Sequence, residues 1–513
     1  MIRIGIDVGG TNTDAVLMRG RTVEHAIKSP TTEDVMSGVL AALEGVLQQS
    51  GVDHGDVDVV MIGTTHFTNA VVQRRDLAPT AVVRLGLPAT ASLPPMVDWP
   101  ADLRATIGWH TFLAHGGHEF DGREISPFDA EELRAIGRRI SDLGIATVAI
   151  SAVFSPVNSD MEERARDVLR EVLPDASFTL SSEIGRIGLL ERENAAIMNA
   201  CLQPLSRATV RAFRTALARA GLEAPFFLTQ NDGTLMSADQ AERFPVLTFA
   251  SGPTNSMRGA AFLSGIKDAV VVDVGGTTTD VGALHNGFPR EASVAVEVGG
   301  VRTNFRMPDV FSIGLGGGSL VHRDPIDVGP ASVGYRLPQE ALVFGGTTLT
   351  ATDIAVAGGR ADIGERERVA PLDASFVASV LAVIADKVER AVERMLLSPE
   401  PIPVIVVGGG AILVSGHVGP LQVLRPDHAP VANAVGAAIA QISGEVDRVF
   451  SLASVPREQA VADAKREAID KAVAAGADPA TTKIVDVDDV PLAYLPGNAT
   501  RIRVKAVGDL GGF

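Results

Sequence analysis

One short phrase occurs twice in this sequence, and it constrains the fold more than any other feature. Residues 7–14 read DVGGTNTD and residues 273–280 read DVGGTTTD, so seven of the eight positions are identical. Each copy follows an apolar run that is rich in β-forming residues, RIGI in the first copy and AVVV in the second. Such a run, ended by two glycines and polar residues, predicts a strand that leads into a tight turn. The chain is therefore expected to present two similar loops.

The residue types in the two loops are suited to binding phosphate. Glycine has no Cβ, so its backbone can adopt a positive φ and bring consecutive N–H groups close to an anion. Threonine adds hydroxyl donors, and an aspartate at a strand end can hold a divalent cation, usually through water. A pair of ordinary hairpin turns is the alternative, but the duplication favours a polyphosphate clamp. The candidate residues are Asp7, Gly9, Gly10, Thr11, Asn12 and Thr13 in the first loop, and Asp273, Gly275, Gly276, Thr277, Thr278 and Thr279 in the second.

Composition limits what can surround these loops. The chain has 513 residues, of which 46% are hydrophobic and only 4% aromatic, so its cores must consist mainly of Ala, Val, Leu and Ile. Such residues suit buried parallel strands and packed helices. Helical and strand patterns alternate over residues 129–180, as in an α/β protein. The formal net charge of −17, with no block of Lys or Arg, argues against a nucleic-acid partner.

Cysteine usage and hydropathy predict the compartment. Cys201 is the one cysteine in the sequence, which excludes a disulfide framework and fits a reducing environment. Asp7 interrupts the N-terminal apolar run too early for a signal peptide. The longest uncharged stretch, near residues 401–424, contains three prolines and a glycine triplet, unlike a membrane-spanning helix. We therefore expect a cytoplasmic protein without membrane contact.

A first lobe is expected over residues 1–185. Within it, a strand ends in the sequence GTTH at residues 63–66, and a helix follows. This third glycine turn places backbone donors at a helix N-terminus, so it can line the same cleft. His66 is a candidate ligand or general acid or base, with a structural hydrogen bond as the alternative reading.

Residues 88–128 show no regular pattern, and long irregular loops are often functional. They contain a group of histidines without the spacing of a metal site, so solvated loop residues are favoured over metal ligands. These histidines are His110, His115 and His118.

A second lobe is expected over residues 186–445, and it contains two further glycine clusters. The sequence GLGGGS at 314–319 has too many glycines for the interior of a helix or strand, so it predicts a tight connection or a surface close to a ligand. A glycine triplet follows a predicted strand at 403–407. The candidate ligand-binding residues are Gly316, Gly317, Gly408, Gly409 and Gly410. Residues 446–513 predict a charged helix and two strands, a small α+β appendage.

Two phosphate loops, one in each lobe, and a late glycine triplet after a strand resemble the actin, sugar-kinase and Hsp70 ATPase superfamily. The resemblance implies an α/β fold with two ribonuclease-H-like lobes and an ATP cleft between them. By position, residues 9–13 would form the first phosphate loop, residues 275–279 the second, and residues 408–411 the adenosine motif. ATP and Mg²⁺ are the cofactors that follow from this resemblance.

In detail, the sequence most resembles the hydantoinase/oxoprolinase family, and within it the ATP-dependent A-type subunit. GIDVGGTNTD resembles the family opening GxDVGGTFTD, and GTTHFTNA resembles GTTVATNA. The motifs SSEIG, NDGTL and SIGLGGGSL follow in the family's order, and the resemblance covers about residues 1–445. Three departures bear on the substrate more than on the ATP chemistry. SGPTNS at 251–256 replaces the usual SGPAGG, the usual PGPACYG is missing, and the C-terminal segment is short.

The family resemblance implies ATP-driven opening of a cyclic amide, such as a hydantoin or 5-oxoproline. Phosphoryl transfer to the amide oxygen creates a phosphorylated imidate that water can attack, and catalysis would be mainly electrostatic. Asp7 and Asp273 would hold Mg²⁺ and supply the general base, with Thr11 and Thr277 among the residues that position phosphates. Asp14 and Asp280 either share this work or stabilise the turns. A B-type subunit is the expected protein partner.

Three other functions remain open from the sequence. A small-molecule kinase would use the same clamp but release a stable phosphorylated product. A ketone carboxylase subunit would require bicarbonate. An ATP-switched regulator would show negligible substrate-stimulated turnover, and its iron–sulfur form needs more cysteines than Cys201.

Overall fold

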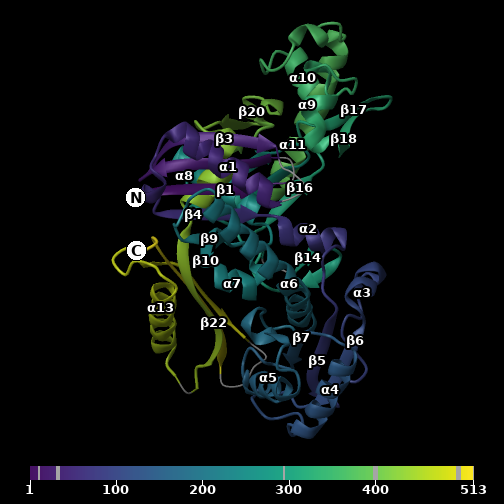
Figure 1. Ribbon diagram of the computed structural model, residues 1–513, viewed down its shortest axis with the longest axis vertical. Coiled ribbons are helices and arrows are strands. Elements are labelled where there is room, and N and C mark those ends of the chain that lie inside the picture. Colours follow the sequence, from purple (N-terminus) through teal and green to yellow (C-terminus); the bar gives the residue numbers. More distant parts are fainter. Residues whose placement is uncertain are drawn as a thin grey trace.

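The computed structural model describes residues 1–9, 12–30, 35–292, 295–396, 402–453, 455–492 and 498–511. Gly10 and Thr11, two of the predicted clamp residues, lie outside these ranges. Two large sheets with helices on their faces make up the body of the molecule, and a smaller sheet projects from it, at the bottom of Figure 1. None of the helices in the described residues is long and apolar enough to cross a membrane.

A nine-stranded sheet contains the first copy of the repeated phrase. Its order is β23-β24-β22-β10-β9-β4-β1-β2-β3. β1 and β2 are antiparallel, whereas β4 and β9 continue the sheet parallel to β1. The phrase therefore forms a hairpin at the carboxyl end of β1, at the same sheet edge as the ends of β4 and β9. The strands are β1 (Ile2–Val8), β2 (Asn12–Arg19), β3 (Thr22–Pro30), β4 (Val59–Thr64), β9 (Phe226–Thr229), β10 (Thr234–Ser237), β22 (Gln441–Ser451), β23 (Lys483–Pro491) and β24 (Ala499–Gly508).

The second sheet repeats this arrangement around the second copy. β11 and β12 form the antiparallel hairpin, and β19 lies parallel to β11 on its other side. The order is β13-β12-β11-β19-β21-β20, with β16 also paired to β12. The predicted fold class, two ribonuclease-H-like α/β lobes, is therefore confirmed. The strands are β11 (Ala269–Val274), β12 (Thr279–His285), β13 (Phe288–Pro289), β16 (Val310–Ile313), β19 (Val404–Val407), β20 (His417–Val418) and β21 (Leu421–Leu424).

Helices cover both faces of each sheet because successive strand residues point to opposite sides. In β4, Val60 and Ile62 pack into the core with α1 (Val35–Ser50) and α6 (Leu189–Arg219), while Val59 and Met61 pack into the core under α13 (Arg457–Ala474). α10 (Ala351–Ala357) and α11 (Ala374–Met395) pack on the second sheet. The shorter helices are α2 (His66–Gln73), α7 (Ala238–Arg243) and α9 (Leu337–Glu340).

Two helices of small residues, α8 (Ser251–Ser264) and α12 (Ala432–Ala438), pack against each other and reach both lobes. A Cβ on Gly259 would lie 1.9 Å from the carbonyl oxygen of Ala432, and one on Gly436 would lie 1.8 Å from that of Asn255. Only glycine permits this backbone approach. The small residues of VANAVGAAIAQI, 431–442, predict a helix over that whole range, but the helix ends at Ala438, because Gln441 and the residues after it form β22.

The third sheet corrects the prediction of an irregular region over 88–128. It is a parallel sheet with the order β6-β5-β7-β8, and β6 and a short helix, α3, lie inside that region. β5 was not predicted, because Arg84 interrupts its apolar pattern; the arginine is fully buried and paired with Glu193 of α6. The elements are α3 (Ala101–Ile107), α4 (Ala130–Asp142), α5 (Asp160–Val172), β5 (Thr80–Leu87), β6 (His110–His115), β7 (Thr147–Ala152) and β8 (Ser177–Leu180).

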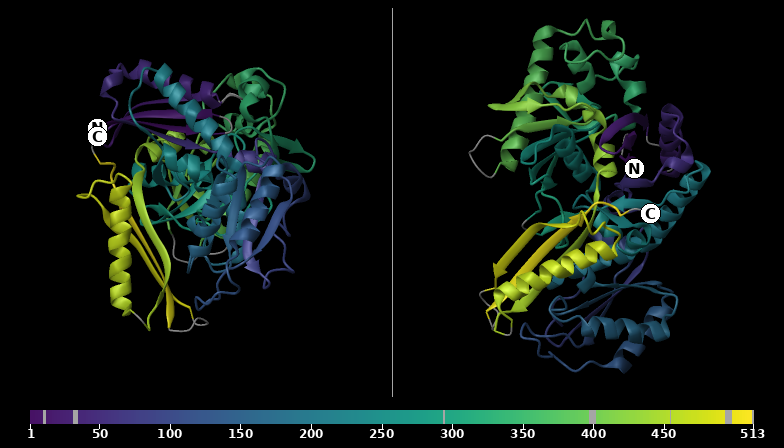
Figure 2. Two further views of the ribbon diagram at one scale, coloured as in Figure 1. Left: turned by 60° about the horizontal axis from the view of Figure 1, so that its bottom comes forward. Right: turned by 90° about the vertical axis from the view of Figure 1, so that its left-hand side faces the viewer.

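The predicted helix and two strands of residues 446–513 are present, but they extend the first sheet instead of standing apart from it (Figure 2). The alanines of α13 pack on β22 and β24 in one core. Chain segments also mix between the expected lobes, since β9 and β10 join β4 in the first sheet. The division into 1–185, 186–445 and 446–513 stays a prediction, and the sheets cross both of its boundaries. Two small ribbons complete the chain, β14 (Val296–Val298) with β15 (Val301–Thr303) and β17 (Ser319–Arg323) with β18 (Ile326–Ser332).

Candidate functional site

The two aspartates of the repeated phrase occupy equivalent places in the two sheets. Asp7 pairs in register with Gly63 of β4, and Asp273 lies beside the residue that follows β19, Gly408. A Cβ on Gly63 would lie 2.3 Å from Asp7 Oδ1, and one on Gly408 would lie 2.3 Å from Asp273 Oδ1. Each carboxylate therefore needs a glycine on the neighbouring strand. Gly408 has a φ of 88°, which also favours glycine.

Asp7 is buried, and side chains from both small-residue helices hold its two oxygens. Asn255 of α8 donates to Asp7 Oδ1 at 2.9 Å, and Asn433 of α12 donates to Asp7 Oδ2 at 3.1 Å. Asn433 also donates to Asp14 at 2.8 Å, and Lys28 donates to the same carboxylate at 2.8 Å. The first hairpin thus carries two buried carboxylates within one hydrogen-bonded network.

The environment shifts the acidity of both principal aspartates in the same direction. Burial raises the pKa of Asp7 to about 6, although the Asn255 hydrogen bond lowers it, and the Asp14 and Asp273 charges raise it further. Burial likewise raises the pKa of Asp273 to about 6 against the lowering effect of a hydrogen bond from Ser256. The charge of Asp273 therefore contributes, after burial and the charge of Asp14, to the raised pKa of Asp7 in the other lobe.

The second loop presents consecutive backbone donors. The N–H groups of Gly317 and Gly318 donate to the carbonyl oxygens of Gly275 and Gly276, at 3.0 and 2.7 Å. With the carbonyl oxygens held in this way, the N–H groups of Gly276, Thr277 and Thr278 have no acceptor within the part of the chain that the structure describes. Three successive N–H groups without an acceptor among the described residues are candidates for binding an anion.

GLGGGS therefore supports the second loop. A Cβ on Gly316 would lie 2.5 Å from the backbone nitrogen of Thr277, and Gly317 N–H is already engaged. Phosphate contact by Gly316 and Gly317 stays a prediction, and the geometry gives both residues a supporting role. Gly275 and Gly276 do not adopt the positive φ that we expected. A Cβ on Gly275 would lie 3.2 Å from the carbonyl oxygen of Thr278 in the same turn.

The loop threonines differ in what they can do. Thr279 is buried and its hydroxyl donates to the carbonyl oxygen of Leu315 at 2.6 Å, so it cannot also donate to phosphate. Thr13 is buried as well. Thr277 and Thr278 remain partly exposed, and they are the threonines of the second loop that can reach a ligand. Gly9 closes the first turn, donating to the carbonyl oxygen of Asn12 at 3.0 Å, as Gly275 does to Thr278 at 2.8 Å.

The glycine triplet lies against the end of β11, at the second loop. Gly410 donates to the carbonyl oxygen of Val274 at 2.7 Å, and a Cβ on Gly409 would lie 3.9 Å from Lys28 Nζ. A cavity of about 600 Å³ begins at the residue after the triplet, Ala411. Its lining is largely apolar with two arginines: Arg360, Ala411, Ile412, Val414, Ser415, Gly416, Arg425, Pro426, Ala429 and Pro430. A cavity of this size and lining can hold a nucleoside.

Sequence reasoning missed the side chains that hold the aspartates. Lys28 comes from β3, Asn255 from α8 and Asn433 from α12, and neither Lys28 nor Asn433 lies in a motif that singles it out. The positive charge of Lys28 lowers the pKa of Asp273 across the site. The one signal was the change of SGPAGG to SGPTNS, because Asn255 and Ser256 are two of the altered residues.

Two of the histidines of residues 88–128 have separate partners. His115 contacts Glu132, and His118 is buried with Nε2 3.2 Å from Asn158. No group of three or more His, Cys, Asp or Glu side chains in the described ranges could hold a metal ion. A metal at Asp7 and Asp273 would therefore need ligands from water or from a bound phosphate. His66 is half-buried, and burial lowers its pKa; its role stays open.

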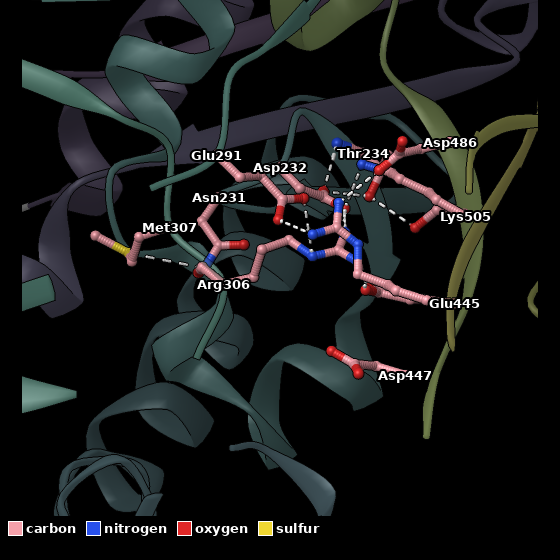
Figure 3. Close-up of polar contacts among 12 residues, drawn as sticks. Asn231, Asp232, Thr234, Glu291, Arg306, Met307, Glu445, Asp447, Asp486 and Lys505 are labelled. Atoms are coloured by element: carbon pink, nitrogen blue, oxygen red, sulfur yellow. Dashed lines mark hydrogen bonds and ion pairs between the residues drawn. The ribbon is translucent and has the colours of Figure 1, made fainter. Parts of the chain in front are cut away.

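A second polar region surrounds Asp232 in the turn after β9, and it was not predicted (Figure 3). Arg306 pairs with Asp232 at 2.7 Å, with Glu291 and with Glu445, and Lys505 pairs with Asp232 at 2.8 Å. Burial raises the pKa of Asp232, but the charges of Lys505 and Arg306 outweigh it and hold this pKa well below its usual range.

Cavities of about 440 and 740 Å³ share lining residues with this region. Its charges are paired with one another and come from the turn after β9, from the segment before β16 and from the C-terminal strands. The network therefore joins three parts of the fold. The carboxylates that suit phosphate chemistry, one from each lobe, lie instead at the repeated loops.

Comparison with known proteins identifies relatives along most of the chain. The family profile described as "Hydantoinase/oxoprolinase N-terminal region" matches residues 3–173, and "Hydantoinase/oxoprolinase" matches residues 192–395. The acetophenone carboxylase gamma subunit of Aromatoleum aromaticum is 27% identical over 86% of this chain and 68% of its own length. The caprolactamase subunit alpha of Pseudomonas jessenii is 28% identical over 70% of this chain, and the match spans only 54% of that subunit.

The solved structures show the same fold. The ATP-dependent caprolactamase from Pseudomonas jessenii aligns with a TM-score of 0.78 at 21% identity, covering 99% of this chain and 87% of that one. Nucleotide-free acetone carboxylase aligns with a TM-score of 0.70 at 17% identity, covering 100% of this chain and 88% of that one. Because these alignments cover almost the whole chain, the C-terminal extension of the first sheet belongs to the shared architecture.

Proposed function

Because this chain belongs to the hydantoinase/oxoprolinase family, we propose that it is the ATP-dependent subunit of an enzyme that opens a cyclic amide. In the proposed reaction the γ-phosphoryl group of ATP moves to the amide carbonyl oxygen. Water then adds to the carbon, the ring C–N bond breaks, and inorganic phosphate leaves. The products are ADP, phosphate and the ring-opened amino acid, so the atoms of ATP, water and amide are all accounted for.

The observation that carries this proposal is the pairing of the two lobes at one site. Asp7 and Asp273 stand at equivalent strand ends, the charge of Asp273 raises the pKa of Asp7, and the second loop offers three backbone N–H groups that have no acceptor among the described residues. Phosphoryl transfer depends mainly on positioning and on stabilising charge. Carboxylates for a metal ion and N–H donors for phosphate oxygens are the groups that this chemistry needs.

The residues present fit a magnesium nucleotide. Asp7 and Asp273 would hold the metal ion, which would neutralise phosphate charge when bound. Thr277 and the N–H groups around it would bind phosphate oxygens, and the cavity at Ala411 would receive the adenosine. Lys28 adds a positive charge where several buried carboxylates would otherwise repel a polyphosphate. Its side chain is one third exposed, 33%, so it can be reached from the site.

A second candidate is an ATP-dependent carboxylase of ketones. It is favoured by the match to the acetophenone carboxylase gamma subunit, which covers more of this chain than the match to the caprolactamase subunit. Both relatives are named as subunits, and this supports a B-type partner for the present chain. The two candidates differ in substrate, because the carboxylase consumes bicarbonate and a ketone, whereas the amide hydrolase consumes neither.

One experiment separates these possibilities. The full chain, alone and with a co-expressed B-type subunit, would be given ATP and Mg²⁺ with a hydantoin, 5-oxoproline, ε-caprolactam or a ketone plus bicarbonate. ADP release measures turnover, and phosphorus NMR identifies the product. We expect ADP and inorganic phosphate with a cyclic amide. A stable phosphorylated organic product would instead establish a kinase, and stimulation only by ketone with bicarbonate would establish the carboxylase.

The site assignment has its own test. Asp7→Ala and Asp273→Ala should each abolish ADP release while the circular dichroism spectrum stays that of the wild type. Full activity in either variant would overturn the two-loop site.

A further inference from the structure

The first turn of α8 differs from the family pattern at three consecutive positions. Residues 251–256 read SGPTNS where the resembling sequences usually read SGPAGG. Alanine and glycine cannot donate hydrogen bonds from a side chain, whereas Thr254, Asn255 and Ser256 all can. The change therefore adds three buried donors at one end of a helix.

Each added side chain has a different target. Asn255 donates to Asp7 at 2.9 Å and to the hydroxyl of Thr229 at 3.0 Å. Ser256, the next residue, lies beside Asp273 of the other lobe and lowers the pKa of its carboxyl. Thr254 points elsewhere, because its hydroxyl donates to the carbonyl oxygen of Asn231 at 2.9 Å. Two adjacent residues of one helix thus lie against the principal carboxylates of the two lobes, and Asn255 holds Asp7 by a hydrogen bond.

The helix that carries these donors cannot easily shift. Gly259 and Gly436 bring the backbones of α8 and α12 into direct contact, and α12 contributes Asn433, the other donor to Asp7. The donors to Asp7 therefore come from one tightly packed pair of helices. A carboxylate fixed on both oxygens keeps the orientation of its remaining lone pairs.

We propose that Asn255 and Ser256 are positioning residues that hold Asp7 and Asp273 in the mutual orientation required to bind the metal ion of a magnesium–nucleotide complex. The proposal rests on the proposed function. Groups that hydrogen-bond to metal ligands orient them, and removing such a group typically costs about 10–100-fold in metal affinity or activity. In this chain Asn255 and Ser256 of α8 place side-chain hydrogen-bond donors beside the carboxylates, and the usual SGPAGG sequence has no such donors at these positions.

The test compares magnesium-dependent nucleotide binding in single variants of the full chain. Asn255→Gly and Ser256→Gly restore the usual residues, and Asn255→Leu keeps the approximate shape of asparagine without its donor. Thr254→Ala is the matched control, since it restores the usual residue in the same turn but does not touch the carboxylates. Binding of the non-hydrolysable analogue AMP-PNP would be measured by calorimetry in MgCl₂ and in EDTA, with thermal unfolding to confirm folding.

The dissociation constant of AMP-PNP in EDTA divided by that in MgCl₂ measures what the metal ion adds to binding. We expect this ratio to fall by about tenfold or more in Asn255→Gly, Asn255→Leu and Ser256→Gly, and to stay at its wild-type value in Thr254→Ala. Affinity in EDTA should change little, because the donors act through the carboxylates. Loss of affinity in EDTA to the same extent would instead indicate general distortion of the site and would overturn the proposal.

The outcomes for the proposed function and for this inference are distinguishable. Wild-type protein that fails to bind AMP-PNP with Mg²⁺ would refute the proposed function and this inference with it. If the wild-type protein binds AMP-PNP with Mg²⁺, and both Asn255→Gly and Ser256→Gly show the same magnesium-dependent affinity, the positioning role alone is refuted. If Asn255→Gly does not fold, Asn255→Leu and Ser256→Gly decide the question.

Discussion

The substitution Gly63→Ala offers a direct test of how tightly Asp7 is packed. A Cβ at this position would lie 2.3 Å from Asp7 Oδ1, 2.3 Å from Asn255 Nδ2 and 3.2 Å from the hydroxyl oxygen of Thr229. The first two separations are far shorter than any stable contact, so either the carboxylate or the amide must move. Both are buried in a close-packed environment, where such a movement displaces other atoms.

The cost can be worked out from two contributions. Overpacking a core by one methyl group costs about 1–3 kcal/mol. Loss of the hydrogen bond between Asn255 and the Asp7 carboxylate costs about 1.5–3 kcal/mol. We therefore expect Gly63→Ala to lower the free energy of unfolding by about 2.5–6 kcal/mol, a large part of the stability of a typical domain. Nucleotide binding in MgCl₂ should weaken as well.

Urea unfolding followed by circular dichroism would measure this change. Gly416→Ala is the control, because Gly416 is exposed and a Cβ there would have no atom within 4 Å. Its free energy of unfolding should stay within about 0.5 kcal/mol of the wild type. If Gly63→Ala unfolds like Gly416→Ala, the packing between β4 and Asp7 is looser than the structure shows, and the reasoning about the site is wrong.

Three further predictions concern other parts of the molecule. Arg84→Met should lower the free energy of unfolding by about 3–5 kcal/mol in urea titrations, because it leaves Glu193, 1% exposed, buried without its cation. Arg214→Met, which breaks a surface ion pair, should cost less than about 1 kcal/mol, and equal effects would contradict the argument. Burial raises the pKa of the Cys201 thiol to about 12, so iodoacetamide at pH 8 should modify it only after unfolding; mass spectrometry would detect any modification of the native protein. Lys28→Gln should weaken ATP binding by about tenfold in calorimetry, since a charge-assisted contact is worth about 1.5 kcal/mol, and unchanged affinity would place Lys28 outside the phosphate site.

Much of the fold was predictable because its signals are local. The apolar run, the glycine pair and the polar residues of each repeated phrase lie next to one another in the chain, so the sequence predicted the strand and the tight turn of each copy and their similarity. Residues 129–180 alternate between helical and strand periodicity, and the structure has α4, β7, α5 and β8 there. Local signals failed at β5, where the buried partner that permits Arg84 lies on a helix more than a hundred residues away.

The repeated DVGGT phrase by itself determined the strand, the turn and the carboxylate at each strand end, because these depend on backbone conformation within a few residues. Only the tertiary structure decided what surrounds those carboxylates. Asn255 and Asn433 reach Asp7 across 248 and 426 residues of sequence, and Lys28 reaches Asp14 from the neighbouring strand. Such contacts depend on how α8 and α12 pack between the lobes. That packing is set by side-chain volumes from distant segments, and no local pattern records it.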